Sequence, residues 1–360
     1  MKKFMTAGAA LLMTTSIAAA GGLDRSGQGI GVIFEDGDYA ELNFGSVSPD
    51  VSGTGLGGAT GNVTPDYMQL GMAYKTQLTD QFSVALVYDQ PFGAHVDYDT
   101  GSGYVLTTTS AEVKSDGITI LGRYEINPNF SFHGGLRYVQ AQGTYDRASI
   151  PDLDGPGPFI AVPEYSSTYS QDGGVGYVLG GAYERPDIAL RVAITYSSEI
   201  DLELGSDNIN SAGLTTTLPE SVNLDFQTGI AADTLLFGSV RYVAWDGFQL
   251  VDDSMFTPTP IVSYDDDVYT YTLGVGRRTN DQLAASFAIG YEASTGDPTG
   301  NLGPTDGFVS YQIGAEYTLD NGLAVSGGIR YVDIGDAVTS GIGGVFNDND
   351  VVGLGLKIGY

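Results

Sequence analysis

The sequence lacks cysteine altogether and is poor in basic residues. None of the 360 residues is Cys, which excludes disulfides, thiolate zinc sites and cysteine nucleophiles. Lysine and arginine number 15 against 44 aspartates and glutamates, so the formal net charge is −29 at pH 7. This balance argues against a nucleic-acid partner, because nucleic-acid binding needs a basic surface. Charged residues form only 16% of the chain, whereas roughly 25% is usual in soluble proteins.

Long hydrophobic runs are also missing beyond residue 20. No later stretch reaches the roughly 18 apolar residues that a membrane-spanning helix requires. The first 20 residues have Lys2 and Lys3, then an apolar stretch over residues 4–17, then three alanines. This pattern predicts a secretory signal peptide over residues 1–20. The mature protein is therefore expected outside the cytoplasm.

Catalytic and metal-binding motifs are sparse. The chain has two histidines, His95 and His133, and no G-x-S-x-G sequence. The acidic runs at residues 265–267 and 347–350 lack the spaced ligands and glycine of a calcium loop, so we interpret them as solvated loops. We predict neither an enzyme nor a cofactor.

What the sequence does contain is strict alternation. Near the C-terminus every second residue is apolar, and glycines and Lys357 stand between them. The apolar positions are Val352, Leu354, Leu356, Ile358 and Tyr360. A period of two places one kind of side chain on each face of a strand. No helical segment accompanies this pattern to cover the apolar face, which favours contact with lipid.

The same alternation recurs often enough to predict fourteen strands. They lie at about 39–47, 68–75, 82–88, 118–124, 130–138, 175–183, 188–196, 222–230, 234–245, 268–277, 283–291, 309–319, 323–331 and 351–360. Short turns alternate with long polar connections, and tyrosines such as Tyr138 and Tyr196 close many strands, as in an interfacial aromatic girdle. In lipid only a closed barrel satisfies the backbone of such strands. We predict an all-β, 14-stranded antiparallel transmembrane β-barrel over residues 39–360, in a bacterial outer membrane, with both mature termini periplasmic. A soluble β-propeller does not explain the hairpins of alternating loop length.

Two local features stand apart from the regular strands. Residues 21–38 contain an apolar group, Ile30, Val32 and Phe34 included, which predicts either a frayed end or a short plug-like segment. Pro91, Phe92 and Gly93 interrupt the third strand, because proline cannot donate to a ladder and glycine bends it. An ordinary strand end at a turn is the alternative.

Several short motifs resemble one family. They are Leu218-Pro219-Glu220, residues 242–250 (YVAWDGFQL), residues 47–53, residues 80–83 and Tyr145-Asp146-Arg147. Together they are similar to the outer-membrane long-chain fatty acid transporters, a family that also contains aromatic-hydrocarbon channels. The likeness spans most of the mature chain.

The resemblance implies passive uptake of long-chain fatty acids or other hydrophobic molecules. It implies a lumen plugged by an N-terminal hatch, here residues 21–38 with Ile30, Val32 and Phe34. It further implies lateral release into the bilayer at a kink in strand three, here Pro91, Phe92 and Gly93. Arg147 matches one basic carboxylate anchor of the family.

A second basic anchor has no match, because residues 242–276 contain no Lys or Arg. A neutral hydrophobe and a loosely held fatty acid therefore both stay open as cargo. The resemblance also implies outer-membrane lipid and lipopolysaccharide as surroundings, and recognition of residues 352–360 by the barrel assembly machinery. From the residues alone, a general aqueous porin and a structural or adhesive barrel are the alternatives.

Overall fold

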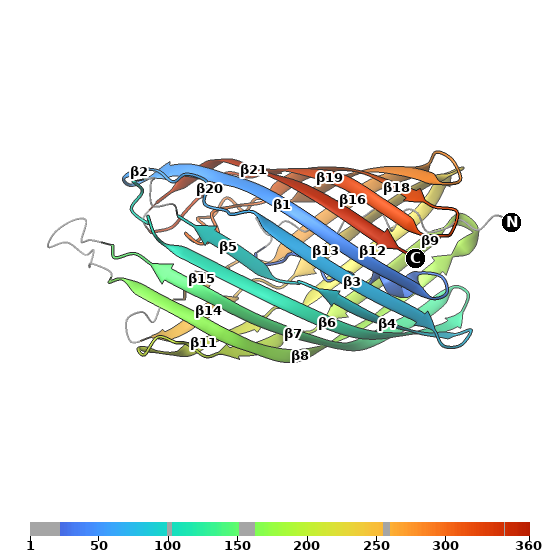
Figure 1. Cartoon of the computed structure of the whole chain (residues 1–360), viewed down its shortest axis with the longest axis horizontal. Coiled ribbons are helices and arrows are strands. Elements are labelled where there is room, and N and C mark those ends of the chain that lie inside the picture. The colour runs from blue at the N-terminus through green and yellow to red at the C-terminus, as the bar shows by residue number, and fades with distance from the viewer. Residues whose placement is uncertain (1–21, 99–102, 151–162, 255–259, 342) are drawn as a thin grey trace.

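A computed structural model describes residues 22–98, 103–150, 163–254, 260–341 and 343–360 as a closed antiparallel barrel (Figure 1). The sheet closes because β1 pairs with β3 along one edge and with β21 along the other. The barrel has 14 strands when β4 and β5 are taken as two halves of one. They are β1 (Tyr39–Gly55), β3 (Tyr67–Gln77), β4 (Phe82–Asp89) with β5 (Gly93–Asp97), β6 (Ser110–Asn127), β7 (Phe130–Arg147), β8 (Tyr165–Arg185), β9 (Leu190–Ser197), β12 (Ser221–Ala231), β13 (Thr234–Val243), β16 (Val268–Arg278), β17 (Leu283–Glu292), β18 (Phe308–Thr318), β19 (Ala324–Ile334) and β21 (Val345–Gly359).

The two-residue period decides which side chains face the lumen. In β9, Arg191, Ala193 and Thr195 are buried, whereas Val192 and Ile194 are exposed on the outer face. A soluble protein would not leave so many large apolar side chains exposed, and a lipid-facing barrel requires them. The predicted fold class and its strand count are confirmed.

The two ends of the barrel differ in their connections. One end, here called the turn end, carries short turns such as residues 128–129 between β6 and β7, and the C-terminal Tyr360 (Figure 1). The opposite end, here called the loop end, carries the long connections. In the turn between β18 and β19, Gly322 has φ +93°, a conformation that glycine adopts without a steric penalty.

Strands β6, β7 and β8 reach further toward the loop end than the sequence pattern predicts. A polar connection to about residue 116 and a loop over residues 148–172 were expected, but β6 begins at Ser110 and β8 at Tyr165. Backbone pairing there continues between polar residues, for example Asp146 with Ser166. Apolar alternation therefore marks only the lipid-facing part of a strand.

The loop end carries a second, smaller sheet. It contains β10 (Ile200–Leu204), β11 (Ser211–Leu218), β14 (Gln249–Ser254) and β15 (Val262–Ser263). Its apolar side chains pack with residues of the barrel wall into one cluster around Trp245, which is fully buried. The remaining elements are short: β2 (Gly58–Ala59), β20 (Ala337–Val338) and the 3-10 turns η2 (Gly31–Phe34) and η3 (Pro186–Ile188).

Among the described residues, no helix is long and apolar enough to span a membrane. The predicted signal peptide, residues 1–20, lies outside the described residues.

Candidate functional site

The barrel wall is interrupted in its third strand. β4 ends at Asp89 and β5 begins at Gly93, and both halves pair with β6. Residues 90–92 lie opposite only residues 115–116, so the strand contains one extra residue, as in a β-bulge. Pro91 lies in the middle of this segment and has no N–H to donate. We call residues 90–92 the wall break.

On its other side the wall break leaves β3 without a strand partner. β3 pairs with β4 only from Met72 onward, and among the described residues no strand pairs with residues 67–71 on that side. The Leu70 N–H instead donates to the side-chain oxygen of Gln90, at 3.0 Å. The backbone N–H of Leu70 is therefore hydrogen-bonded to a side chain and not to the backbone of a neighbouring strand.

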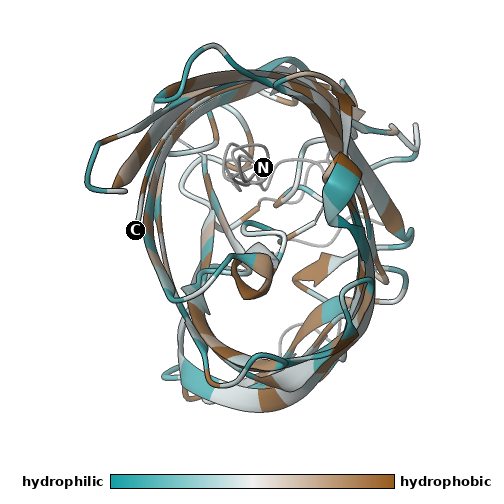
Figure 2. Ribbon diagram, turned by 90° about the vertical axis from the view of Figure 1, so that its right-hand side faces the viewer, coloured by the Kyte–Doolittle hydropathy of each residue, from teal (hydrophilic) through white to brown (hydrophobic). Residues whose placement is uncertain are grey.

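Figure 2 shows short segments inside the barrel wall, and the N-terminal segment is the one that pairs with residues of the break. We call residues 22–38 the hatch segment. Asp24 forms an antiparallel bridge with Phe92. Two backbone hydrogen bonds of 2.8 Å flank the bridge, from Arg25 to Pro91 and from Gly93 to Leu23. The hatch segment thus adds a short strand to the edge that the break exposes.

Polar contacts hold the hatch segment to the opposite wall. Arg241 of β13 forms a buried ion pair with Asp24 and donates to the Asn223 side chain at 2.8 Å. Asn223 in turn donates to the Gly27 carbonyl at 2.9 Å. Because the hatch segment is tied both to the break and to β12 and β13, it crosses the lumen.

The apolar turn η2 lies deeper, toward the turn end. Val32, Ile33 and Phe34 are buried among inward-facing residues of β3, β4, β6, β8 and β9. Two guanidinium groups lie over the Phe34 ring, at 4.8 Å for Arg123 and 4.7 Å for Arg191. Such cation–π contacts stabilise an aromatic ring among charges.

Charges on this side of the lumen are largely paired. Arg123 contacts Glu184 and lies 3.5 Å from Glu125, and Lys357 lies 3.7 Å from Glu41. Lys75 donates to the carbonyls of residues 35 and 37 at 2.9 and 2.8 Å. Of these charges, Lys75 and Arg123 contact the hatch segment, Lys75 through its carbonyls and Arg123 through the Phe34 ring.

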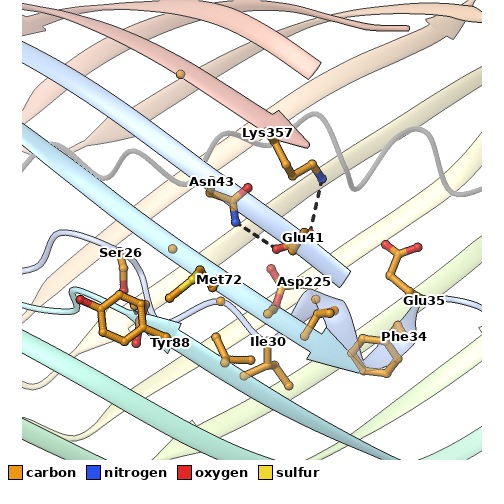
Figure 3. Close-up of a pocket in the computed structure, with 18 of the residues that line it drawn as sticks. Ser26, Ile30, Phe34, Glu35, Glu41, Asn43, Met72, Tyr88, Asp225 and Lys357 are labelled. Carbon is orange, nitrogen blue, oxygen red and sulfur yellow. Dashed lines mark hydrogen bonds and ion pairs between the residues drawn. The ribbon is translucent and has the colours of Figure 1, made fainter. Parts of the chain in front are cut away.

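Two cavities adjoin the wall break. The first, here the turn-side cavity, has a volume of about 220 Å³ and lies between the hatch segment and β1, β3, β4 and β21 (Figure 3). Ile30 and Phe34 line it from the hatch segment. Met72, 44% exposed on the outer face, also belongs to its lining. The turn-side cavity is therefore bounded beside the break by residues of the wall itself.

The second, here the loop-side cavity, measures about 60 Å³. Phe92 and Leu23 line it at the break, and Leu202, Leu214 and Leu250 line it from the small sheet. It belongs to the apolar cluster around Trp245, whose ring centroid lies 6.1 Å from that of Phe92. Phe92 thus faces the loop-side cavity, while Gln90 lines the turn-side one.

The structure brings most of the predicted site residues together. Pro91, Phe92 and Gly93 form or flank the break, and Ile30, Val32 and Phe34 lie in the lumen, where they line the turn-side cavity. Arg147 lies apart at the end of β7. Its side chain donates to the Pro163 carbonyl at 3.1 Å, and it lines neither cavity.

Sequence reasoning missed the residues that join the hatch segment to the wall. Asp24 and Arg241 lie 217 positions apart, and no local pattern links them. The pairing of Asp24 with Phe92 is equally non-local. One available signal was that Asp24 and Arg25 are the only charged residues in an otherwise neutral, glycine-rich lead over residues 21–34.

Comparison with known proteins agrees with this geometry. A family model described as "Outer membrane protein transport protein (OMPP1/FadL/TodX)" matches residues 38–342. A FadL homologue of Pseudomonas aeruginosa shares 15% identity over 91% of both chains, with a TM-score of 0.74. The Pseudomonas putida toluene transporter TodX shares 13% identity over 95% of both chains, with a TM-score of 0.65. The Ralstonia pickettii toluene transporter TbuX shares 13% identity over 90% of both chains, with a TM-score of 0.60.

No curated protein matches the chain in sequence. At such low identity the solved structures show the fold alone. The family match, however, extends over most of the barrel and agrees with its closed 14-stranded wall. The chain belongs to the outer membrane transport protein family that includes OMPP1, FadL and TodX.

Proposed function

We propose that this outer-membrane barrel takes up hydrophobic molecules passively and releases them sideways through the wall break into the bilayer. The observation that carries the proposal is the wall break itself, which borders the loop-side cavity on one side and the turn-side cavity on the other. The structural relatives named as toluene transporters and as a FadL homologue support a hydrophobic cargo. In this proposal the loop end faces outward and both mature termini are periplasmic.

The physical reason for a side exit is the cost of exposing apolar surface. Returning such surface to water costs about 25 cal/mol per Å². A cargo that leaves through the wall meets acyl chains directly and never crosses the charged turn-side lumen. Phe92 would be the last apolar contact inside, and Met72 and Tyr88 the first ones outside.

The hatch segment acts as the closure in this proposal. Residues 23–26 cover the break, and Ile30, Val32 and Phe34 fill the lumen below it. Release then requires the short added strand to move away from residues 91–93. The role of Arg147 as a carboxylate anchor stays a prediction that neither cavity lining supports.

The occupied lumen favours this function over a general aqueous porin. A porin needs a water-filled path, whereas here the hatch segment crosses the lumen and its charges are engaged in pairs. Lipopolysaccharide around the acidic loops, and recognition of residues 352–360 by the barrel assembly machinery, remain part of the proposal.

A reversible staple between hatch and wall tests the proposal. Asp24 and Phe92 form a non-hydrogen-bonded antiparallel pair, because the hydrogen bonds beside them join the neighbouring residues. The Cα atoms of such pairs lie about 4.5 Å apart. That distance suits a disulfide, and the natural chain has no Cys to interfere. In the Asp24→Cys/Phe92→Cys variant, oxidation should abolish uptake of a labelled neutral aromatic by cells, and reduction should restore it.

Each single-cysteine variant serves as the control for lost side chains, because it cannot form the staple. If the oxidised double variant takes up the aromatic as fast as the same variant after reduction of the disulfide, release through the break is contradicted. Equal uptake of labelled oleate and of the aromatic by cells with and without the protein would remove the channel function altogether.

A further inference from the structure

The connections at the entrance to the barrel carry charge of one sign. The seven connections at the loop end contain no lysine or arginine, and each contains at least one aspartate or glutamate. They are residues 56–66, 98–109, 148–164, 198–220, 244–267, 293–307 and 335–344. An anion that approaches this end meets repulsion, while an uncharged molecule does not.

The loop-side cavity continues this lack of positive charge. Its lining is mostly aliphatic and aromatic, with Leu23, Phe92, Val113, Leu202 and Leu214 among its residues. The single ionisable carboxylate in the lining is Glu112, whose side chain binds Lys114 at 2.8 Å. No lysine or arginine belongs to the lining formed by the described residues, and the segments outside them after residue 21 contain none either.

Two hydroxyl groups of the cavity lining already have hydrogen-bond acceptors within the protein. Tyr169 donates to Asp252 at 2.5 Å, and Thr216 donates to the Gln249 carbonyl at 3.0 Å. Asp252 is 2% exposed and also accepts from Tyr165 and Ser211. A carboxylate placed beside Tyr169 would therefore lie near the buried negative charge of Asp252.

The cations nearest this cavity lie outside its lining and have partners. Arg25, beside the wall break, donates to the Gly93 carbonyl at 2.9 Å, and its guanidinium lies 3.9 Å from the centre of the Tyr67 ring. Arg241 is paired with Asp24, and Arg123 with Glu184. Arg147 is not in the cavity lining but interacts with Tyr145, which is, and its guanidinium also lies 5.9 Å from the Tyr165 ring and donates to the Pro163 carbonyl. Burying a carboxylate without a compensating cation is unfavourable, because its lost hydration is not replaced.

We infer that the loop-side cavity accepts uncharged hydrophobic molecules and rejects carboxylates of the same shape, so that the cargo is a neutral hydrophobe rather than a fatty acid anion. The inference rests on the proposed uptake function and narrows its cargo. It assigns specificity to a missing cation and to the acidic entrance.

The only tryptophan of the chain reports on this cavity. Trp245 packs against Phe92, which lines it. In the full mature protein in nanodiscs, butylbenzene should change Trp245 fluorescence saturably. Phenylbutyrate has the same ring and a charged end. Its concentration at half-saturation should be at least about 100-fold higher, equivalent to about 2.8 kcal/mol at 1.4 kcal/mol per tenfold. Below the pKa of phenylbutyric acid the difference should shrink to less than tenfold, because the ligand is then neutral.

A positive charge introduced at the cavity should weaken the preference for the neutral ligand. Thr216 is half-buried on the same face of β11 as Leu214 and Leu218, so Thr216→Lys places an ammonium group at the rim. The ratio of the two dissociation constants should fall at least tenfold in Thr216→Lys, and it should not fall in the uncharged Thr216→Gln control. The low-pH titration of the unmodified protein gives the same test without any substitution.

Three outcomes would overturn the inference. If phenylbutyrate binds within tenfold of butylbenzene at neutral pH, the cavity does not discriminate, although the proposed uptake function survives. If its binding is lost in Arg147→Gln, a carboxylate anchor exists at that residue. If neither compound binds and neither is taken up by cells, the proposed function fails together with its cargo.

Discussion

The two cavities beside the wall break differ in what holds their walls in place. The loop-side cavity is enclosed by leucines and aromatic rings around Trp245. The turn-side cavity is bounded by the hatch segment, which ion pairs and hydrogen bonds fix to the wall. The first cavity is therefore held by apolar packing, and the second depends on polar contacts of the hatch segment. The wall break lies where the first gives way to the second.

Apolar packing and buried ion pairs serve different purposes in these two regions. Apolar packing at the loop end is non-directional, so it can yield to a cargo and close again. Buried ion pairs that hold the hatch segment, such as Asp24 with Arg241, are directional and costly to break singly, which suits a segment that must return to one position. Four substitutions test this contrast, beginning with the one expected to have the largest effect.

Removing the cation that anchors the hatch segment should have the largest effect. Arg241→Met leaves Asp24 buried and unpaired, a loss of roughly 3–5 kcal/mol in a buried pair. Hydrogen exchange of residues 22–34 should accelerate strongly while that of the barrel strands stays slow. Arg277→Met, at an exposed position on β16, is the matched control.

The double variant Asp24→Leu/Arg241→Met sharpens this test. Replacing both charges by apolar groups removes the unpaired carboxylate and should recover most of the protection. Unchanged exchange in the single variant would show that the ion pair does not anchor the hatch segment.

Truncating the apolar cluster should have the next largest effect, confined to the loop end. Leu202 is 1% exposed, and Leu202→Ala should destabilise the small sheet by about 2–5 kcal/mol through the cavity that it leaves. Trp245 emission should move to longer wavelength, because water reaches the ring. Leu179→Ala, on the outer face at 54% exposure, should leave that emission unchanged. A red shift in the control alone would contradict the assignment.

Neutralising the buried carboxylate of the small sheet should have a moderate effect. Asp252 accepts from three hydroxyl groups, and an amide offers only one oxygen for them. Asp252→Asn should therefore cost about 1–3 kcal/mol. Faster protease cleavage at the loop end would report the loss, with the exposed Asp265→Asn as control. Equal cleavage of both variants would mean that Asp252 does not tie β14 to the wall.

Replacing the ring between the two arginines should have the smallest effect. Phe34→Leu keeps an apolar side chain but removes two cation–π contacts, each worth about 0.5–2 kcal/mol. In planar bilayers the hatch segment should open more often, seen as brief conductance steps. Ile30→Leu, in the same segment but away from the guanidinium groups, should show no such steps. Identical conductance traces for both variants would mean that apolar packing of the hatch segment, and not the cation–π contacts, keeps the lumen closed.

Much of the barrel was predictable because lipid enforces a two-residue period. Ile194 and Leu354 face outward as the alternation requires, and the pairing of β1 with β21 closes the wall. The interruption at Pro91 was visible because proline has a fixed consequence for a ladder. Strand lengths at the loop end were not predictable, since β6 and β8 continue through polar residues such as Ser166 that carry no apolar period.

The candidate site was predictable only in part. Phe92 and Phe34 were evident from composition and local order. Their partners were not, because Asp24 meets Arg241 and Phe92 meets Trp245 only through the closed barrel. The small sheet of β10, β11, β14 and β15 also depends on contacts between separate connections. Such contacts follow from topology, not from any local pattern.

The most direct test follows a cargo along its path. Butylbenzene carrying a diazirine would be photolysed with the full mature protein in liposomes, and the labelled residues would be identified by mass spectrometry. The account predicts labels at Leu214 and Phe92 inside and at Met72 and Tyr88 outside, beside the break. Labels at Glu125 and Glu184 in the charged lumen, with none at Phe92 or Met72, would contradict it.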